Sequence, residues 1–197
     1  DVPPLQGSIL DIGGGGNKGS HYRFIEIGKD AQLKVADVIK RPGTDFVVDI
    51  NVDRVPLGDA SQDYIFLFNI LEHVFAHDRV LSEVKRLLRP GGKLLGSIPF
   101  LVNVHPDPHD YVRFTEEALV DLFSRNGFSV EVIEPIGRGP FLAAYEQLDS
   151  LIPSFLHALF LPCVWLADSV VSRARPNRNF GAKFPLAYNF VVEKSVV

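Results

Sequence analysis

The stretch SILDIGGGGN, residues 8–17, decides the fold of this chain. A short apolar run ends in Asp11 and leads into four consecutive glycines. Glycine adopts positive φ angles and lets a ligand approach the backbone, so this stretch predicts a strand that turns into a helix around a ligand. Gly14, Gly16 and Gly19 also satisfy G-x-G-x-x-G, the fingerprint of dinucleotide-binding folds, so two cofactor classes compete for this loop.

The composition bounds the class of protein. A chain of 197 residues with 46% hydrophobic residues suits a single globular domain over 1–197, and its net charge of −4 argues against a nucleic-acid partner. The single cysteine, Cys163, excludes an internal disulfide and a cysteine-based zinc site, and it favours a reducing compartment. Because no basic segment followed by an apolar one opens the sequence, we expect no export signal and a cytoplasmic location.

Strand-like and helix-like segments alternate along the chain. This order predicts a Rossmann-like, doubly wound α/β fold with a mostly parallel seven-stranded sheet and helices on both faces. After the first strand, further strands are expected at 33–37, 45–50, 64–68, 93–100, 128–133 and 186–192, and helices at 18–29, from 71 to 88 and from 115.

Four of the predicted strands deliver a polar residue to the same edge of the sheet. Asp11, Asp37, Asp49 and Asn69 all fall at carboxyl ends of strands. Ligands of open α/β sheets bind outside these ends, where the strand order reverses, so the four side chains predict a ligand pocket. For Asp49 a simple strand-end cap is the alternative.

With these residues in place, the sequence resembles the class I S-adenosylmethionine-dependent methyltransferases, in particular the type 11 group. The resemblance covers about residues 8–133, with a looser echo at 185–194. It implies the fold given above, S-adenosylmethionine as the cofactor, and a methyl group transferred to a small-molecule acceptor. The segments that carry it are LDIGGGGN, Asp37, VVDIN, VPLGDASQDYIFLFNILEHV, LSEVKRLLRPGGKLLGSIPF, DYVRFTEEAL and NGF.

The same resemblance implies roles for individual residues. The loop of Gly13, Gly14 and Gly15 passes under the methionine moiety, and Asp11 helps to order its amino group. Asp37 accepts hydrogen bonds from both ribose hydroxyls, which suits a carboxylate because it is an acceptor-only group.

At the two ends of the cofactor, Asp49 and Ile50 flank the adenine, and the Asn69 region lies near the methionine. Asn17 stands where the family often has a third alternating glycine, and asparagine tolerates left-handed conformations better than most residues.

Two alternative functions stay open. A nicotinamide-dependent oxidoreductase of Rossmann type shares the glycine loop and Asp37, but it does not explain VPLGDASQDY or EVKRLLRPGG. A methyltransferase-like domain that binds its cofactor or a partner without turnover would share every motif.

The loop HPDPHDY, residues 105–111, follows a predicted strand and is expected over the cofactor mouth. Methyl transfer chiefly needs an acceptor held in line with the methyl group, and a base only where the acceptor loses a proton. Imidazoles titrate near neutral pH, so His105 and His109 are the predicted catalytic bases, which favours an oxygen acceptor. The alternative is a turn whose side chains bond local backbone.

No metal site is expected from the sequence. His73 lies in NILEHV and His77 one helical turn further on, but a pair of histidines without evident further ligands is weak evidence for a metal. Some relatives use a glutamate before such a segment as a ligand, and here that position is Asn69.

Residues 141–178 form the least ordinary segment. No Asp, Glu, Lys or Arg occurs from 150 to 167, and Arg173, Arg175 and Arg178 follow closely. Because Pro153 and Pro162 interrupt the apolar run, we expect no spanning helix but a helical insertion before the last strand. It covers the acceptor pocket, forms a homodimer or contacts a membrane surface, and its apolar character favours an apolar or lipid-linked acceptor.

Overall fold

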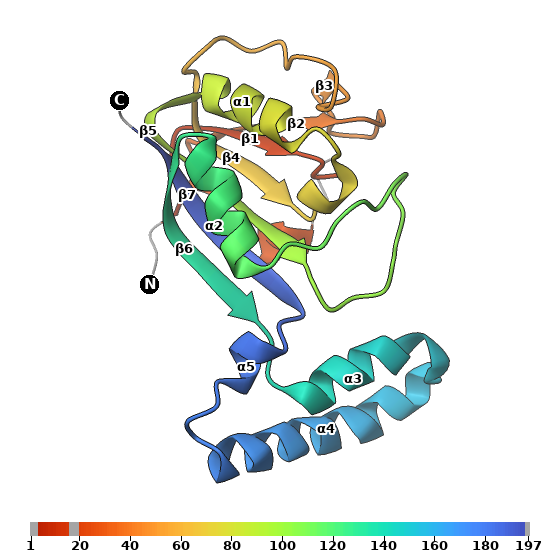
Figure 1. The fold of residues 1–197 in the computed structure, drawn as a ribbon. Coiled ribbons are helices and arrows are strands. Elements are labelled where there is room, and N and C mark those ends of the chain that lie inside the picture. Colours follow the sequence, from red (N-terminus) through yellow and green to blue (C-terminus); the bar gives the residue numbers. More distant parts are fainter. Residues whose placement is uncertain (1–3, 16–19, 196–197) are drawn as a thin grey trace.

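The computed structural model describes residues 4–15 and 20–195, and it forms a seven-stranded sheet in the order β3-β2-β1-β4-β5-β7-β6 (Figure 1). The strands are β1 (Ser8–Ile12), β2 (Gln32–Asp37), β3 (Phe46–Val47), β4 (Gln62–Phe68), β5 (Leu88–Pro99), β6 (Phe128–Ile136) and β7 (Ala187–Lys194).

The strand pairing confirms the predicted mostly parallel sheet. Strands β3, β2, β1, β4 and β5 pair in parallel, whereas β7 lies antiparallel between β5 and β6. The order reverses beside β1, because the chain moves outward to β2 and β3 and then returns to β4 on the other side. A ligand is expected at this switch point, at the carboxyl ends of β1 and β4. The antiparallel β7 differs from the 3-2-1-4-5-6 order of dinucleotide-binding folds.

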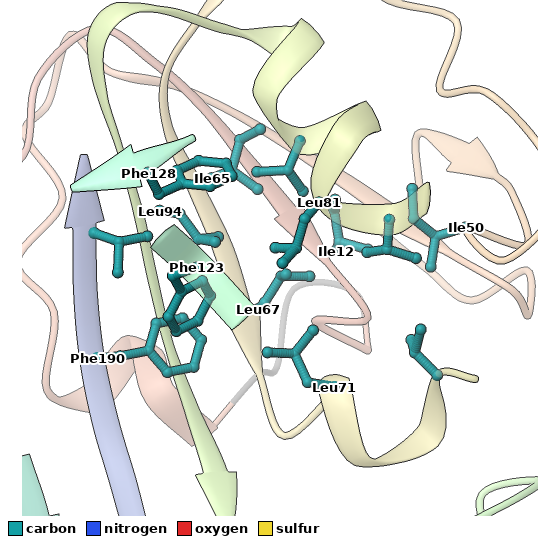
Figure 2. Packing of buried hydrophobic residues seen from close by; sticks show 14 of the residues in the cluster. Ile12, Ile50, Ile65, Leu67, Leu71, Leu81, Leu94, Phe123, Phe128 and Phe190 are labelled. Atoms are coloured by element: carbon teal, nitrogen blue, oxygen red, sulfur yellow. The ribbon is translucent and has the colours of Figure 1, made fainter. Parts of the chain in front are cut away.

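One face of the sheet packs against two helices, α1 (His77–Leu87) and α2 (Glu116–Arg125) (Figure 1). Thr115 caps α2 by accepting the Ala118 N–H, and Glu116 and Glu117 lie favourably in its first turn. A cluster of buried apolar side chains packs between helices and sheet; Figure 2 shows Ile65, Leu67, Leu81, Leu94, Phe123 and Phe190 among its members.

The other face carries the 3-10 helix η1 (Ser20–Arg23), whose His21 stacks on Phe68 with ring centroids 4.7 Å apart. The helix expected at 18–29 is therefore wrong for its described part. Backbone pairing with Leu5 replaces helical bonds there, because Leu5 donates to Glu26 and Gly28 donates to Leu5. Residues 18 and 19 lie outside the described residues.

Two further boundaries differ from the predictions. The helix expected from 71 to 88 is divided into a 3-10 turn, η2 (Leu71–His73), and the helix α1. The division falls at Val74, which has an extended backbone and a buried side chain. The strand expected at 45–50 keeps only β3. Before it, the Asp45 carboxylate takes the Val35 N–H, and after it a turn begins in which the Asp49 carbonyl accepts the Val52 and Asp53 N–H groups.

Between β6 and β7 the chain forms α3 (Pro140–Leu148), η3 (Asp149–Leu151), α4 (Ser154–Ala174) and α5 (Phe180–Lys183). Helices α3 and α4 pack on each other as a hairpin that projects from the end of the sheet (Figure 1). Buried Asp168 of α4 accepts the N–H groups of Phe141 and Leu142, so it caps the N-terminus of α3.

Helix α4 is continuous through Pro162, so the expected interruption at this proline is wrong. Proline removes one helical hydrogen bond, that to the carbonyl of Ala158, and this residue is exposed. Among the described residues, α4 is the one helix long and apolar enough to cross a membrane, judged by length and composition alone.

Candidate cofactor site

The glycine loop leaves β1 in a conformation that excludes side chains. Gly13 and Gly15 have φ angles of +78° and +67°, in the region that favours glycine. A Cβ atom on Gly14 would lie 1.9 Å from the Asp11 carboxylate, and one on Gly13 would lie 2.0 Å from Ile70. The loop therefore keeps its backbone open toward the switch point. Gly16 and Asn17 lie outside the described residues.

Asp11 is fully buried directly below this loop. Its Oδ2 lies 2.8 Å from Nε2 of His21 and accepts the Tyr22 hydroxyl, whereas Oδ1 has no partner among the described residues. Burial and the neighbouring Asp11 carboxylate raise the pKa of Tyr22, so this hydroxyl keeps its proton and donates it. A buried carboxylate oxygen without a donor is costly, and a donor from a ligand would satisfy it.

Asp37 ends β2 beside the loop and is 5% exposed. Its Oδ2 accepts the Gly15 N–H at 3.2 Å and lies 3.3 Å from the Arg41 guanidinium, and its Oδ1 accepts the Ile39 N–H at 2.9 Å. A carboxylate has about four acceptor positions, so Oδ1 keeps capacity for a ligand hydroxyl. Because two donors already approach Oδ2, a second hydroxyl there would compete with Arg41.

Asp49 serves its own turn as well as the rim. Its Oδ1 accepts the backbone and side-chain N–H groups of Asn51 at 3.0 and 3.1 Å, which is the strand-end cap given above as the alternative role. Asp49 and the buried Ile50 also line a cavity of about 330 Å³ together with Asp37. We call it the Asp37 cavity.

Asn69 lies where β4 ends and has a φ angle of +54°, which is uncommon for a residue other than glycine. Its Oδ1 accepts the Ser97 hydroxyl at 2.8 Å, and its N–H donates to the Ser97 carbonyl. Asn69 and Gly13 line both the Asp37 cavity and a second cavity of about 520 Å³, the glycine cavity. The two cavities therefore meet at these residues.

The glycine cavity contains residues that the sequence analysis did not select. Phe24, Ile25 and Phe68 give it apolar walls, while His21, Ser97 and Asn189 add polar groups. These residues lie on η1 and the following loop, β4, β5 and β7. Ser97 could have been found from its position near the end of a parallel strand, but nothing in the sequence points to His21 or Asn189.

The predicted bases lie apart from the glycine cavity. His109 lines the Asp37 cavity, and His105 is absent from the linings of both cavities. The His105 ring lies beside Glu72 and His73 instead, and all three offer ligand atoms within 4.8 Å of one another. The catalytic roles of His105 and His109 stay predictions. Asp37, Asp49 and Asn69 line the Asp37 cavity, whereas Asp11 is buried under the glycine loop and lines neither cavity.

The comparisons with known proteins agree with this geometry. Residues 10–96 match the family model described as a methyltransferase domain. A probable S-adenosylmethionine-dependent methyltransferase of Mycolicibacterium smegmatis is 32% identical over 102 residues, which cover 49% of this chain and 40% of that relative. A similar relative from Mycobacterium tuberculosis is 35% identical over 38% of this chain, so the chain spans less than half the length of these curated relatives.

Solved structures show the same fold at low identity. A Methanosarcina mazei S-adenosylmethionine-dependent methyltransferase is 15% identical, with a TM-score of 0.56 over 96% of this chain and 93% of its own. A Burkholderia thailandensis N-methyltransferase, solved with S-adenosylhomocysteine, is 16% identical, with a TM-score of 0.56 over 96% and 71% of the two chains.

Over residues 10–96, less than half of its length, the chain matches the methyltransferase-domain family in sequence, and over nearly its whole length it has the fold of S-adenosylmethionine-dependent methyltransferases. The matching relatives are named as S-adenosylmethionine-dependent, and one of the solved structures holds S-adenosylhomocysteine. The glycine loop by itself fits both cofactor classes, whereas the antiparallel β7 differs from the strand order of dinucleotide-binding folds.

Proposed function

We propose that this chain binds S-adenosylmethionine across the two cavities and transfers its methyl group to a small-molecule acceptor. The observation that carries the proposal is the open glycine loop between two buried carboxylates, Asp11 and Asp37. When bound, S-adenosylmethionine supplies an electrophilic methyl group on a positively charged sulfur. The protein's part is to position the two reactants and to exclude water.

The described residues fit this cofactor. Oδ1 of Asp11, which has no partner among the described residues, would accept from an ammonium group at the glycine loop, and Oδ1 of Asp37 would accept from a ribose hydroxyl. Asp49 and Ile50 line the Asp37 cavity, where they would flank the adenine. Asn69 lies at the junction, where a ligand that spans both cavities must pass.

Calorimetric titration with S-adenosylmethionine, S-adenosylhomocysteine and NAD in parallel tests this proposal. We expect both adenosyl ligands to bind and NAD not to bind. Binding of NAD alone would make the chain an oxidoreductase, and binding of none would contradict the cofactor assignment. Cofactor binding without turnover on any acceptor would favour the non-catalytic alternative.

For the acceptor, we propose an oxygen atom on an apolar or lipid-linked molecule. The glycine cavity combines the apolar walls of Phe24 and Phe68 with the polar groups of Ser97 and Asn189. Such a lining suits a molecule with an apolar body and one hydroxyl.

We also propose a cytoplasmic location and no nucleic-acid partner, as the composition predicts.

The α3–α4 hairpin supports a lipid-linked acceptor because it exposes an apolar stripe. Positions three or four residues apart lie on one helix face, and this stripe follows that spacing along α4. Helix α4 packs on α3, and the cavity linings described above come from other segments. The exposed stripe on α4 comprises Phe155, Leu159, Leu166 and Val170, with exposed fractions of 79%, 62%, 63% and 55%, and Leu151 in the preceding η3 is 77% exposed.

The charges at the end of this stripe indicate what kind of surface it binds. Arg173, Arg175 and Arg178 are exposed at its C-terminal end, although the chain as a whole is acidic. An apolar stripe bordered by arginines suits a membrane with anionic headgroups, since each basic residue near such a surface contributes about 1 kcal/mol. We propose that the hairpin lies on the membrane surface, because Asp168 within α4 is committed to capping α3.

Sedimentation with vesicles tests the hairpin. We expect binding to vesicles that contain phosphatidylglycerol, weaker binding to pure phosphatidylcholine, and loss of binding in the double variant Leu159→Asp, Leu166→Asp. Exposed Val120 on α2 offers a matched control, Val120→Asp, which should bind vesicles normally. A stable dimer that does not bind vesicles would replace the membrane with a second copy of the chain.

A further inference from the structure

Glu72 in η2 is a buried acid without a hydrogen-bond partner. Its side chain is fully buried, and neither carboxylate oxygen has a donor among the described residues. Burial raises the pKa of Glu72, as expected for a carboxylate removed from water. Buried charges in folded proteins are paired or bind metals, so this side chain lacks a partner that its surroundings require.

Two imidazoles face this carboxylate from different segments. Nε2 of His73 lies 3.7 Å from Oε1 of Glu72, and Nε2 of His105 lies 3.8 Å from the same oxygen. Both separations are too long for hydrogen bonds. The two rings meet edge to face, with centroids 5.3 Å apart. Three potential ligand atoms therefore converge without bonding to one another.

The other ring nitrogens fix which atoms face inward. Nδ1 of His73 contacts the carbonyl oxygen of His109, and Nδ1 of His105 lies 2.9 Å from the carbonyl oxygen of Asn103. A carbonyl only accepts, so in a neutral ring the proton is on Nδ1 and the lone pair is on Nε2. Metal-binding histidines have this arrangement, with the second nitrogen donating to a carbonyl or carboxylate.

The positive group of Arg113 lies near Glu72 but donates its hydrogen bonds to Asp110. Arg113 thereby holds the pKa of the Asp110 carboxyl well below its usual range. Asp110 also accepts the His105 N–H at 2.9 Å, and so it helps to hold the loop that carries His105.

We propose that Glu72, His73 and His105 bind a divalent transition-metal ion of the zinc type. Two imidazole nitrogens and one carboxylate oxygen are ligands that zinc and similar ions accept. Ligands about 2.1 Å from a tetrahedral ion lie about 3.4 Å apart. The two histidine nitrogens lie 3.7 and 3.8 Å from the Glu72 oxygen, and all three atoms lie within 4.8 Å of one another. The remaining coordination positions are free for water or for a substrate oxygen.

The ion would connect two parts of the candidate site. His73 lines the Asp37 cavity, and His105 lies on the loop after β5 whose Asp107 and His109 line the same cavity. A shared ion therefore fixes this loop against η2 at the edge of the cavity. Metal binding does not depend on the proposed methyl transfer, so each can fail separately.

The test uses chelator-treated protein that has no affinity tag and carries Cys163→Ser, which removes the single thiol. It is titrated with Zn²⁺ by calorimetry and with Co²⁺ by absorption spectroscopy. We expect one equivalent of either ion to bind and to raise the melting temperature. His105→Ala should weaken binding at least about tenfold, since it removes one of three ligands. This side chain is half exposed, so the variant should fold. His157→Gln, on the distant hairpin, is the matched control and should bind like the parent.

Glu72→Gln separates a ligand from a structural acid. Without metal, this variant should melt at or above the parent temperature because it removes an uncompensated buried charge, and Zn²⁺ should no longer raise that temperature. The absence of stoichiometric binding in the parent, or full binding in His105→Ala, would overturn the proposal and leave Glu72 sharing a proton with the two imidazoles.

Discussion

The rim of the sheet and the α3–α4 hairpin differ in which side chains they bury and which they expose. At the rim, polar groups are buried and hydrogen-bonded: Asp11 to the side chains of His21 and Tyr22, and Asp37 to the backbone of the glycine loop. On the hairpin, apolar side chains such as Phe155 and Leu166 are exposed, and the buried polar group, Asp168, holds the two helices together. The rim suits one ligand of defined shape, whereas the hairpin suits an extended apolar surface.

A substitution in the glycine loop should have the largest effect on binding at the rim. Gly14→Ala places a methyl group 1.9 Å from the Asp11 carboxylate, so the loop or the acid must move. We expect calorimetry to show at least about a 100-fold loss of S-adenosylmethionine affinity, about 2.8 kcal/mol. Gly58→Ala is the control, because a Cβ there meets no atom within 4 Å. Equal affinities for the two variants would contradict the role of the loop.

Asp37→Ala tests the ribose contact at the rim. Loss of a hydrogen bond to a charged group costs about 1.5 to 3 kcal/mol, so affinity should fall about 10- to 100-fold. Vesicle binding should not change, since the hairpin is untouched. Asp30→Ala alters an exposed acid and should leave titrations with the cofactor unchanged. Wild-type affinity in Asp37→Ala would remove Asp37 from the cofactor site.

Arg175→Gln should weaken vesicle binding and leave cofactor affinity unchanged, the reverse of Asp37→Ala. Removing one positive charge near an anionic surface costs about 1 kcal/mol, or about fivefold in vesicle partitioning. Salt should reduce the difference between variant and parent, because it screens exposed charges. Cofactor affinity should stay the same, and a change in it would mean that hairpin and rim are coupled.

Asp168→Asn should give an effect confined to the hairpin. Asparagine keeps one acceptor oxygen, but its NH2 group faces the other N–H, so one of the two caps on α3 is lost at a cost of about 1 kcal/mol. Amide hydrogen exchange at Phe141 and Leu142 should accelerate about fivefold, with no change in β1. Uniform acceleration across the sheet would show that the hairpin contributes to global stability.

The rim was predictable from sequence because parallel strands end together. An acid after each apolar run, as at Asp11 and Asp37, is thereby placed at one edge whatever the loops do. The cluster of Glu72, His73 and His105 was not predictable, because it depends on how one loop folds back over η2.

The helix expected at 18–29 failed for a similar reason. Pairing of Leu5 with residues 26–28 is a contact between segments distant in sequence, which local periodicity does not encode. For Pro162 the local signal itself was misleading. Proline disfavours the interior of a helix, but the long helix α4 continues through it.

The insertion begins and ends at neighbouring points of the sheet. Ile136 of β6 pairs with Ala187 of β7, and the Leu186 N–H donates to the Ile136 carbonyl. Some fifty residues thus occupy the place of a β-hairpin turn. Joining two ends already in contact costs little, since closure entropy grows slowly with loop length. The sheet can therefore carry an insertion of this length at that point, because the pairing of β6 with β7 already holds its two ends together.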